Sequence, residues 1–322
     1  NAGTALTTGT QNTLIGSLAG DALTDTDFNV AVGVASLSGD TLGSKSTAIG
    51  YYALATQNFT SATEVFNTAV GHNAGRAITT GVQNTLIGGL AGDAITTGGY
   101  NTAVGYLSGS AITTGSGNAF FGLRAGAGTT TGTANTFVGG SSNSYAGYAN
   151  TTGANNTAVG TDALAANTTA SNNTAVGMDA LTAITTGANN TAVGLNAGDA
   201  LIDADYNVAV GEGALGADTY GSNSTAIGRL ALAQQNFTSA TNSENTAVGY
   251  IAGYSVTTGT HNTLIGMASG DAITTGGTNT AVGSFSLSAN TTAGGNTAVG
   301  YQALLANTTA SNNTAVGLSA LS

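Results

Sequence analysis

A pentapeptide that recurs along the whole chain constrains its fold more than any other feature. The motif N-T-A-V-G, or a close variant, occurs 18 times in 322 residues, and 14 of the 17 intervals between copies are 17 residues long. The other three intervals are 21 residues long and follow the copies that begin at Ser46, Asn135 and Ser224. Self-similarity at a fixed short period is the signature of a repeat architecture in which each unit packs against its neighbours.

The columns of the repeat predict the shape of each unit. The Gly that closes the pentapeptide is present in all 18 copies, which indicates a backbone conformation or a close approach that a Cβ would obstruct. The residue before it is Val or Ile in 17 copies, and one place earlier stands Ala, Leu or Phe. Three residues after the Gly comes Ala or Ser in every coil. We therefore expect a short apolar strand, a Gly corner, a short second segment and a polar turn.

This pattern predicts an all-β fold. Two or three Gly residues per unit argue against a helix, because each costs about 1 kcal/mol in a helix interior. A 17-residue coil cannot enclose its own apolar side chains, so each T-A-V segment must pair in parallel with the same segment one coil away. We expect a parallel β-solenoid of about 18 coils, with residues 1–322 forming a single continuous array excerpted from a longer fibre protein.

The Asn column is interpreted as structural. Asn opens 16 of the 18 copies, and stacked Asn amides can hydrogen-bond from coil to coil. Asn also tolerates the left-handed conformations that corners demand. In three consecutive coils the residues expected to carry the stack are Asn156, Ala158, Val159, Gly160, Asn173, Val176, Gly177, Asn190, Val193 and Gly194.

The strand pattern predicts an apolar face outside the coil. Adjacent side chains of a strand point to opposite faces, so the Ala158 and Val159 columns must look in opposite directions. Both columns are apolar, and monomers rarely expose a continuous apolar stripe. The simplest cover is the same stripe on identical chains. Because Thr shares the parity of Val in most copies, the same face also resembles the Thr arrays of ice-binding solenoids, and this alternative stays open.

The repeat resembles a known family of surface fibres. The run from Asn155 to Ala163, N-N-T-A-V-G-T-D-A, is similar to the N-S-V-A-I-G-x-x-S repeat of the YadA-like heads of trimeric autotransporter adhesins, and to the repeats of phage tail fibres. The coil here is longer than is common in those heads. The resemblance implies a left-handed β-roll, three chains around one axis, an extracellular location on a cell or virion, and an adhesive or spacer role.

Charge and composition exclude several functions. Four Lys and Arg against 15 Asp and Glu give a net charge of −11, which opposes binding to nucleic acid or anionic lipid. No apolar run approaches the roughly 18 residues of a membrane span, so no membrane insertion is expected in this segment. The two histidines, His72 and His261, occupy different columns and join no recurring nucleophile, so we expect neither catalysis nor a cofactor.

Two acidic clusters are weak candidates for Ca²⁺ binding. Hard oxygen ligands at short spacing can hold this ion. The alternative is a solvated acidic turn, because the chain has no EF-hand loop and no Ca²⁺-binding β-roll repeat. The carboxylates of the two clusters are Asp21, Asp25 and Asp27, and Asp199, Asp203 and Asp205.

The three 21-residue coils are predicted to insert four residues at one shared point of the coil. Inserted surface turns often carry recognition, which makes their aromatic residues candidate contacts with a host surface or matrix. The alternative is a loop that folds back over the coils. The candidate recognition residues are Phe59, Tyr145, Tyr148 and Phe237. In the same insertions Asn58 and Asn236 begin N-x-[ST] sequons and are possible glycosylation sites.

These observations favour a non-enzymatic extracellular fibre, either an adhesin head or a tail-fibre shaft. Two alternatives are a self-assembling extracellular filament and an ice-binding solenoid that uses its Thr array. The expected partners are identical chains, as a homotrimer or filament.

Overall fold

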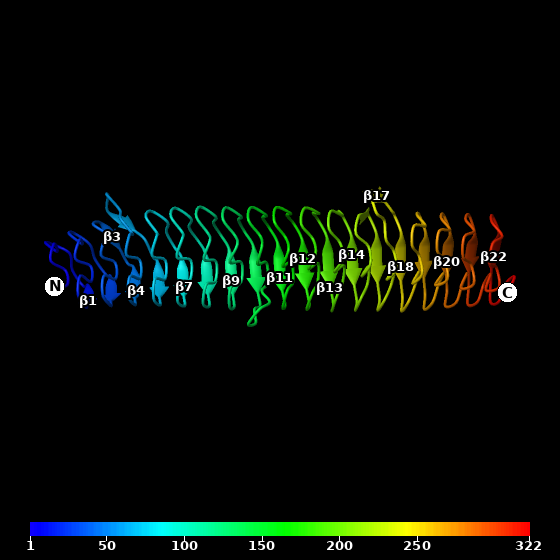
Figure 1. Ribbon diagram of the computed structural model, residues 1–322, viewed down its shortest axis with the longest axis horizontal. Coiled ribbons are helices and arrows are strands. Elements are labelled where there is room, and N and C mark those ends of the chain that lie inside the picture. Colours follow the sequence, from blue (N-terminus) through cyan, green and yellow to red (C-terminus); the bar gives the residue numbers. More distant parts are fainter. The chain divides into compact units, whose positions relative to one another are not determined.

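The computed structural model describes residues 1–322 and shows an all-β chain without any helix. It forms two compact units, unit 1 (Asn1–Thr161) and unit 2 (Asp162–Ser322). Within each unit the chain is a parallel β-solenoid, and the coils together number about 18 at about 17 residues each, as the repeat predicts. Figure 1 shows the short strands of one unit lying side by side in chain order.

Every coil contributes one three-residue strand to the ladder of its unit. In unit 1 the strands are β1 (Thr13–Ile15), β2 (Val30–Val32), β4 (Thr47–Ile49), β6 (Thr68–Val70), β7 (Thr85–Ile87), β8 (Thr102–Val104), β9 (Ala119–Phe121), β10 (Thr136–Val138) and β11 (Thr157–Val159). In unit 2 they are β12 (Thr174–Val176), β13 (Thr191–Val193), β14 (Val208–Val210), β16 (Thr225–Ile227), β18 (Thr246–Val248), β19 (Thr263–Ile265), β20 (Thr280–Val282), β21 (Thr297–Val299) and β22 (Thr314–Val316).

Two further pairs of two-residue strands each join a long coil to the 17-residue coil before it. Unit 1 pairs β3 (Gly43–Ser44) with β5 (Thr63–Glu64), and unit 2 pairs β15 (Gly221–Ser222) with β17 (Thr241–Asn242), both in parallel.

The register places equivalent residues of successive coils opposite one another. In unit 2 Thr174 pairs with Thr191, Ala175 with Ala192 and Val176 with Val193. The Thr174 N–H donates to the Asn190 carbonyl at 2.8 Å, and the Gly194 N–H donates to the Val176 carbonyl at 2.8 Å. Backbone bonds therefore run from coil to coil, and the chain satisfies its polar groups by stacking.

The corner Gly is required by both conformation and space. Gly177 has φ +136°, a region that L side chains rarely adopt, and a Cβ there would lie 2.4 Å from the carbonyl oxygen of Gly194 in the next coil. The same approach recurs along each unit, for example at Gly88, whose Cβ would lie 2.4 Å from the Gly105 oxygen. This confirms the sequence interpretation of the invariant Gly.

The buried Asn column forms a hydrogen-bonded ladder inside each unit. In unit 2 the Asn190 N–H donates to Asn173 Oδ1 at 2.9 Å, while Asn190 Nδ2 donates to the Ala204 carbonyl at 2.7 Å. In unit 1 the Asn156 N–H donates to Asn135 Oδ1 at 3.0 Å. The predicted coil-to-coil amide bonds are therefore confirmed.

The expectation that this column adopts the left-handed conformation is wrong. The left-handed residue is the one before it, such as Asn172 with φ 62° or Asn189 with φ 61°. The side chain of the column residue points inward to bond the ladder, so the preceding residue makes the corner. Tyr100 and Phe28 adopt the same φ at that position, so the corner does not require Asn.

Three buried positions together fill the interior of each coil: the strand centre, and the fourth and seventh residues after the corner Gly. A large side chain at one of them is accompanied by a small one at another. One solution combines Ala158 and Leu164 with a polar Asn167. Another combines Leu86 and Ile95 with a Gly at the fourth position, Gly92, where a Cβ would lie 2.8 Å from each of the two side chains.

A third solution places a ring at the strand centre. Phe120 and Phe137 are fully buried and stack with centroids 5.0 Å apart and planes 2° apart. A Cβ at Gly126 would lie 2.6 Å from the Phe120 ring, so the Gly makes room for the aromatic side chain.

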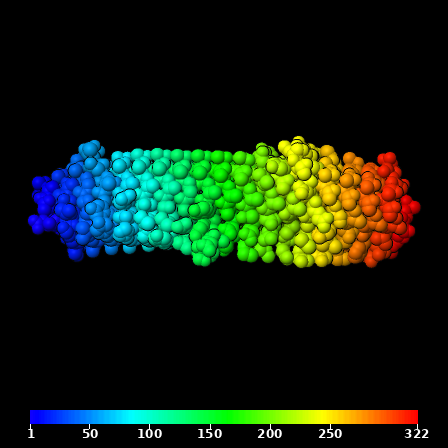
Figure 2. Space-filling view, viewed as in Figure 1, coloured from blue at the N-terminus to red at the C-terminus, as the bar shows by residue number.

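The three long coils do not insert their extra residues at one shared point, contrary to the sequence expectation. In the first and third, the extra residues follow Gln57 and Gln235 and lead into β5 and β17. In the second they follow the corner directly, because Gly140 pairs with Tyr145 in an antiparallel bridge and Ala146 takes the buried small-residue position. Within unit 1 the two insertions leave the coils at different edges (Figures 1 and 2).

Candidate functional site

The outward face of the strand ladder is apolar in both units. In β11 the Ala158 side chain is fully buried, whereas Val159 is 37% exposed. Val193, Ile87 and Ile227 are exposed in the same column. The residue after the corner Gly extends this face, because many coils place a large exposed side chain there: Val34, Tyr51, Tyr106, Met178, Leu195, Tyr250, Met267 and Tyr301. We call these two columns the strand face.

Phe59 and Phe237 do not act as exposed recognition residues. They are 8% and 7% exposed, so the insertions fold back and bury these rings, which is the alternative that the sequence left open. The Phe59 N–H donates to Asp40 Oδ1 at 3.1 Å, and the Phe237 N–H donates to Asp218 Oδ1 at 3.1 Å. The ring is buried because a buried carboxylate holds its backbone against the coil.

That carboxylate belongs to a polar network that replaces the missing Asn of the Ser46 and Ser224 coils. Gln57 Nε2 donates to Asp40 Oδ2 at 2.6 Å and to Ser46 Oγ at 3.1 Å. Gln57 Oε1 accepts from Asn67 Nδ2 at 2.9 Å, so the amide of the long coil bridges to the next Asn of the ladder.

Unit 2 repeats the network with Gln235, Asp218 and Asn245. Burial raises the pKa of the Asp218 carboxyl, although hydrogen bonds from Gln235, Phe237 and Gly221 act in the opposite direction. Sequence reasoning missed this network. The recurrence of Asp40 and Gln57 as Asp218 and Gln235 beside the only two Ser-opened copies could have revealed it.

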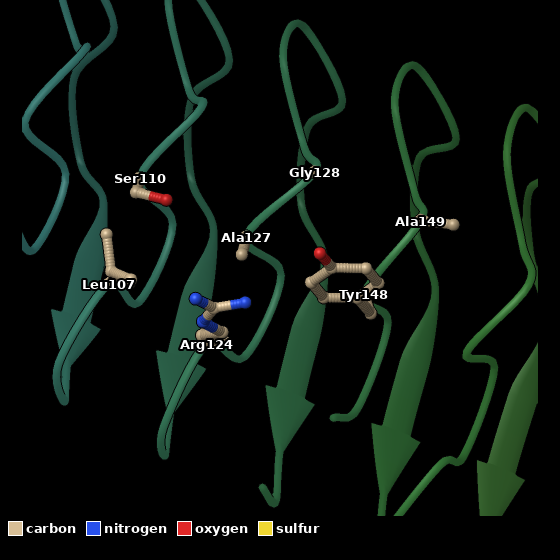
Figure 3. A pocket seen from close by; sticks show the side chains of 7 residues that line it. All are labelled: Leu107, Ser110, Arg124, Ala127, Gly128, Tyr148 and Ala149. Atoms are coloured by element: carbon tan, nitrogen blue, oxygen red, sulfur yellow. The ribbon is translucent and has the colours of Figure 1, made fainter. Parts of the chain in front are cut away.

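Tyr145 and Tyr148 are brought together beside an arginine. Their ring centroids lie 5.2 Å apart, and the Arg124 guanidinium lies over the Tyr145 ring at 5.6 Å. Arg124 and the exposed Tyr148 line a hollow of about 360 Å³ with Leu107 and Ser110 (Figure 3).

The acidic candidates form no metal centre in the structure. Asp25 Oδ1 accepts from Thr8 Oγ1 at 2.6 Å, and Asp27 Oδ1 accepts from the Thr10 N–H at 2.6 Å, which lowers the pKa of Asp27. No group of three or more His, Cys, Asp or Glu side chains that could hold a metal ion exists in residues 1–322, so neither Asp21 nor its neighbours converge.

The corresponding acids of unit 2 behave alike. Asp203 Oδ1 accepts from Thr186 Oγ1 at 2.7 Å, and Asp205 Oδ1 accepts from the Ala188 N–H at 2.6 Å. Partial burial raises the pKa of Asp199. These carboxylates bond the neighbouring coil, which is the solvated-turn alternative.

The histidines and the sequons lie on the surface. His72 stacks on Tyr51 with centroids 5.3 Å apart, and His261 Nε2 lies 3.3 Å from Glu244 Oε2. Asn58 and Asn236 are exposed, and their Oδ1 atoms accept from Thr41 and Thr219. Glycosylation there stays a prediction.

In comparisons with known proteins, no protein-family model, no curated protein and no solved structure matches the chain. None of its segments is a helix long and apolar enough to cross a membrane.

Proposed function

We propose that the protein is a non-enzymatic extracellular fibre in which identical chains associate through the strand face. The observation that carries the proposal is the repetition of exposed Val or Ile in the strand ladder of both units. Each such side chain removes apolar area from water when it is covered, at about 25 cal/mol per Å². An apolar stripe that repeats at every strand spacing can be covered along its whole length by the same stripe of another copy of the chain.

Two features of the coils suit a fibre. The ladder is continuous through each unit, so load along it is shared by backbone bonds and by the Asn column. The side chains that vary most between coils lie outside the ladder, where adhesion can be varied without changing the stack. The resemblance to YadA-like heads supports a left-handed homotrimer with an adhesive or spacer role.

The decisive experiment measures the mass of the native chain and of Val193→Asp by light scattering. Native protein is expected at three times the chain mass, and the variant at a lower mass, because a carboxylate would be buried in the association surface. Asn189→Asp is the matched control, because it adds the same charge at an exposed position of the same coil. A native monomer, or equal masses for both variants, would refute association through the strand face.

Electron microscopy of the same material separates the forms of assembly. Rods of one length support the closed oligomer, whereas rods of indefinite length support a self-assembling filament. If the protein is a monomer and produces thermal hysteresis, the exposed array of Thr and Val side chains binds ice instead.

A further inference from the structure

The hollow beside Arg124 has an electrostatic setting found nowhere else in the chain. Arg124 is the only charged residue between Asp93 and Asp162, although the chain as a whole carries −11. The insertion that follows β10 places two tyrosines next to this isolated cation.

Each of the other three cations has an acid close enough to interact with its charge. Lys45 Nζ lies 2.5 Å from Glu64 and Arg229 Nε lies 2.9 Å from Glu212. Arg76 forms no ion pair within 4.0 Å, but its charge acts on Asp93 and lowers the pKa of that carboxyl, against the effect of burial. Arg124 has no carboxylate within 4.0 Å. Its guanidinium therefore keeps its hydrogen-bond donors available for an anion from outside.

The guanidinium is held in position by aromatic contacts. It lies over the Tyr145 ring, and Tyr145 is fixed in turn because its hydroxyl donates to the Ser142 carbonyl at 2.8 Å. Tyr145 also supports Tyr148, which is 42% exposed. Figure 3 shows the Arg124 guanidinium, the Ser110 hydroxyl and the Tyr148 ring around one hollow. Such preorganisation reduces the entropy lost when a ligand binds.

We propose that this hollow binds the carboxylate-bearing unit of an acidic sugar. The planar guanidinium matches a carboxylate with two parallel hydrogen bonds. The exposed Tyr148 ring offers an apolar surface with a polar tip, which suits a sugar that has C–H groups on its ring and hydroxyls at its edge. Ser110 adds a hydroxyl, and about 360 Å³ lies within the size range of small-molecule sites.

Two other hollows provide internal comparisons. In unit 2 a hollow of about 380 Å³ is lined by Tyr250, Tyr254 and Asp271, so it has tyrosines but an acid in place of the cation. In unit 1 Arg76 and Tyr52 line a hollow in which Asp93 already acts on the arginine. The first hollow lacks a cation, and in the second the charge of Arg76 is offset by Asp93, so we assign the acidic sugar to the Arg124 hollow alone.

The hollow lies outside the strand face, because its residues belong to the second segment of the coil. Leu107 and Arg124 are the second residues after their corner glycines, and Ser110 lies three residues further on than Leu107. The site therefore adds a ligand class to the proposed adhesive role without depending on association. Sugar binding is measured per chain and chain association by mass, so a failure of sugar binding would leave the proposed association untouched.

The test is an NMR titration of the full chain with methyl β-glucuronide and with methyl β-glucoside, which lacks only the carboxylate. We expect saturable binding of the glucuronide and at least about tenfold weaker binding of the glucoside. Arg124→Gln should lose at least about tenfold in glucuronide affinity, and Tyr148→Ala should weaken binding further than Tyr148→Phe, which keeps the ring. Arg76→Gln is the matched control and should bind as the native chain does.

Several outcomes would overturn the proposal. They are no saturable binding of the glucuronide, equal binding of the glucoside, or equal loss in Arg76→Gln and Arg124→Gln. Inorganic sulfate that competes fully while Tyr148→Ala has no effect would show a simple anion site, which also contradicts a sugar site. Melting temperatures of all variants, measured in parallel, identify any loss that comes from unfolding, and Arg124→Lys then supplies the same test with the charge kept but the planar fork removed.

Discussion

At the scale of single residues, the corner Gly links local conformation to stacking. Its positive φ turns the chain away from the strand, and the missing Cβ lets the next coil approach at hydrogen-bond spacing. These two requirements coincide at the interior corners of each unit, and they separate at Gly117, the residue before Asn118. Gly117 has φ +70°, but the nearest atom to a Cβ built there is the Ala134 N at 3.9 Å, which is an ordinary van der Waals contact.

This difference predicts unequal costs for two identical substitutions. Gly177→Ala is expected to destabilise unit 2 by about 2–5 kcal/mol, because backbone strain and a clash with the Gly194 carbonyl add. Gly117→Ala carries the strain alone and should cost about 1–3 kcal/mol. Chemical denaturation of both variants measures the two free energies of unfolding. Equal costs would show that space between coils does not explain the invariant Gly.

The role of a single residue could be predicted from the sequence when the same role recurs in every coil, and not when it depends on a contact of one coil. Gly160 and Asn156 were assigned correctly, because a column that is nearly invariant over 18 coils reports a shared backbone role. The position of the left-handed residue was missed, since the column before Asn varies from Tyr to Gln and carries no pattern. Burial of Phe59 was undecided from sequence, because it depends on a contact with Asp40 in the preceding coil.

At the scale of the coil, the interior depends on matched volumes rather than on one preferred side chain. Ala at the strand centre accompanies Leu at the fourth position after the corner in the Ala158 coil, whereas Phe120 accompanies Gly126. Leu at that fourth position adopts a positive φ, 53° at Leu164, so the backbone there accepts either residue.

A double substitution in the Phe120 coil tests this matching. Phe120→Ala should cost about 3–5 kcal/mol, because it leaves a cavity beside Gly126. Gly126→Leu alone should also destabilise unit 1, since its Cβ would lie 2.6 Å from the Phe120 ring. The two changes together should be less harmful than Phe120→Ala, because they recreate the Ala and Leu pair of other coils. Additive costs in a denaturation cycle would contradict the matching.

The insertions mark the limit of prediction at this scale. Their presence and their length follow from the spacing of the repeat, but the second insertion occupies a different edge from the first. Counting residues from the corner Gly aligned Ser142 with the buried small-residue column, whereas Ala146 fills it. Sequence distance cannot reveal which of two small residues is buried, and this choice decides where Tyr145 and Tyr148 lie.

The network that joins the third long coil to the coil before it predicts a pH dependence of unit 2. Because burial raises the pKa of Asp218, the folded chain keeps a proton over a pH range in which the unfolded chain has lost it. The resulting contribution to the free energy of unfolding is fully present below pH 3.8, the ordinary pKa of the group, and is lost as pH rises through the pKa of the folded chain. As pH rises from acid to neutral, the melting temperature of Asp218→Asn should therefore fall less than that of the native chain.

Asp199 is the control for this measurement. Its pKa is also raised by burial, and it is present in both proteins, so it cancels from the difference between the two melting curves. Parallel pH profiles for native protein and Asp218→Asn would show that the carboxyl at 218 does not titrate differently on folding.

At the scale of the whole molecule, net charge and apolar surface act in opposite directions on association. Every chain carries −11, so identical chains repel at long range, while the exposed Val and Ile of the strand face attract only on contact. Such a protein combines a high solubility of single chains with an association that depends on screening. The strand face and its apolar character were predictable from strand alternation, whereas the arginine hollow needed the contacts between coils.

This balance predicts that added salt strengthens association. The Debye length falls from about 30 Å at 0.01 M to about 3 Å at 1 M, which removes the repulsion between chains and leaves apolar contacts intact. Analytical ultracentrifugation across this range should therefore show an association constant that rises with salt, in both native protein and Arg124→Gln. Glucuronide binding to the Arg124 hollow should weaken over the same range, because it depends on attraction between opposite charges. An association constant that falls with salt would mean that ion pairs between chains, rather than the strand face, hold the chains together.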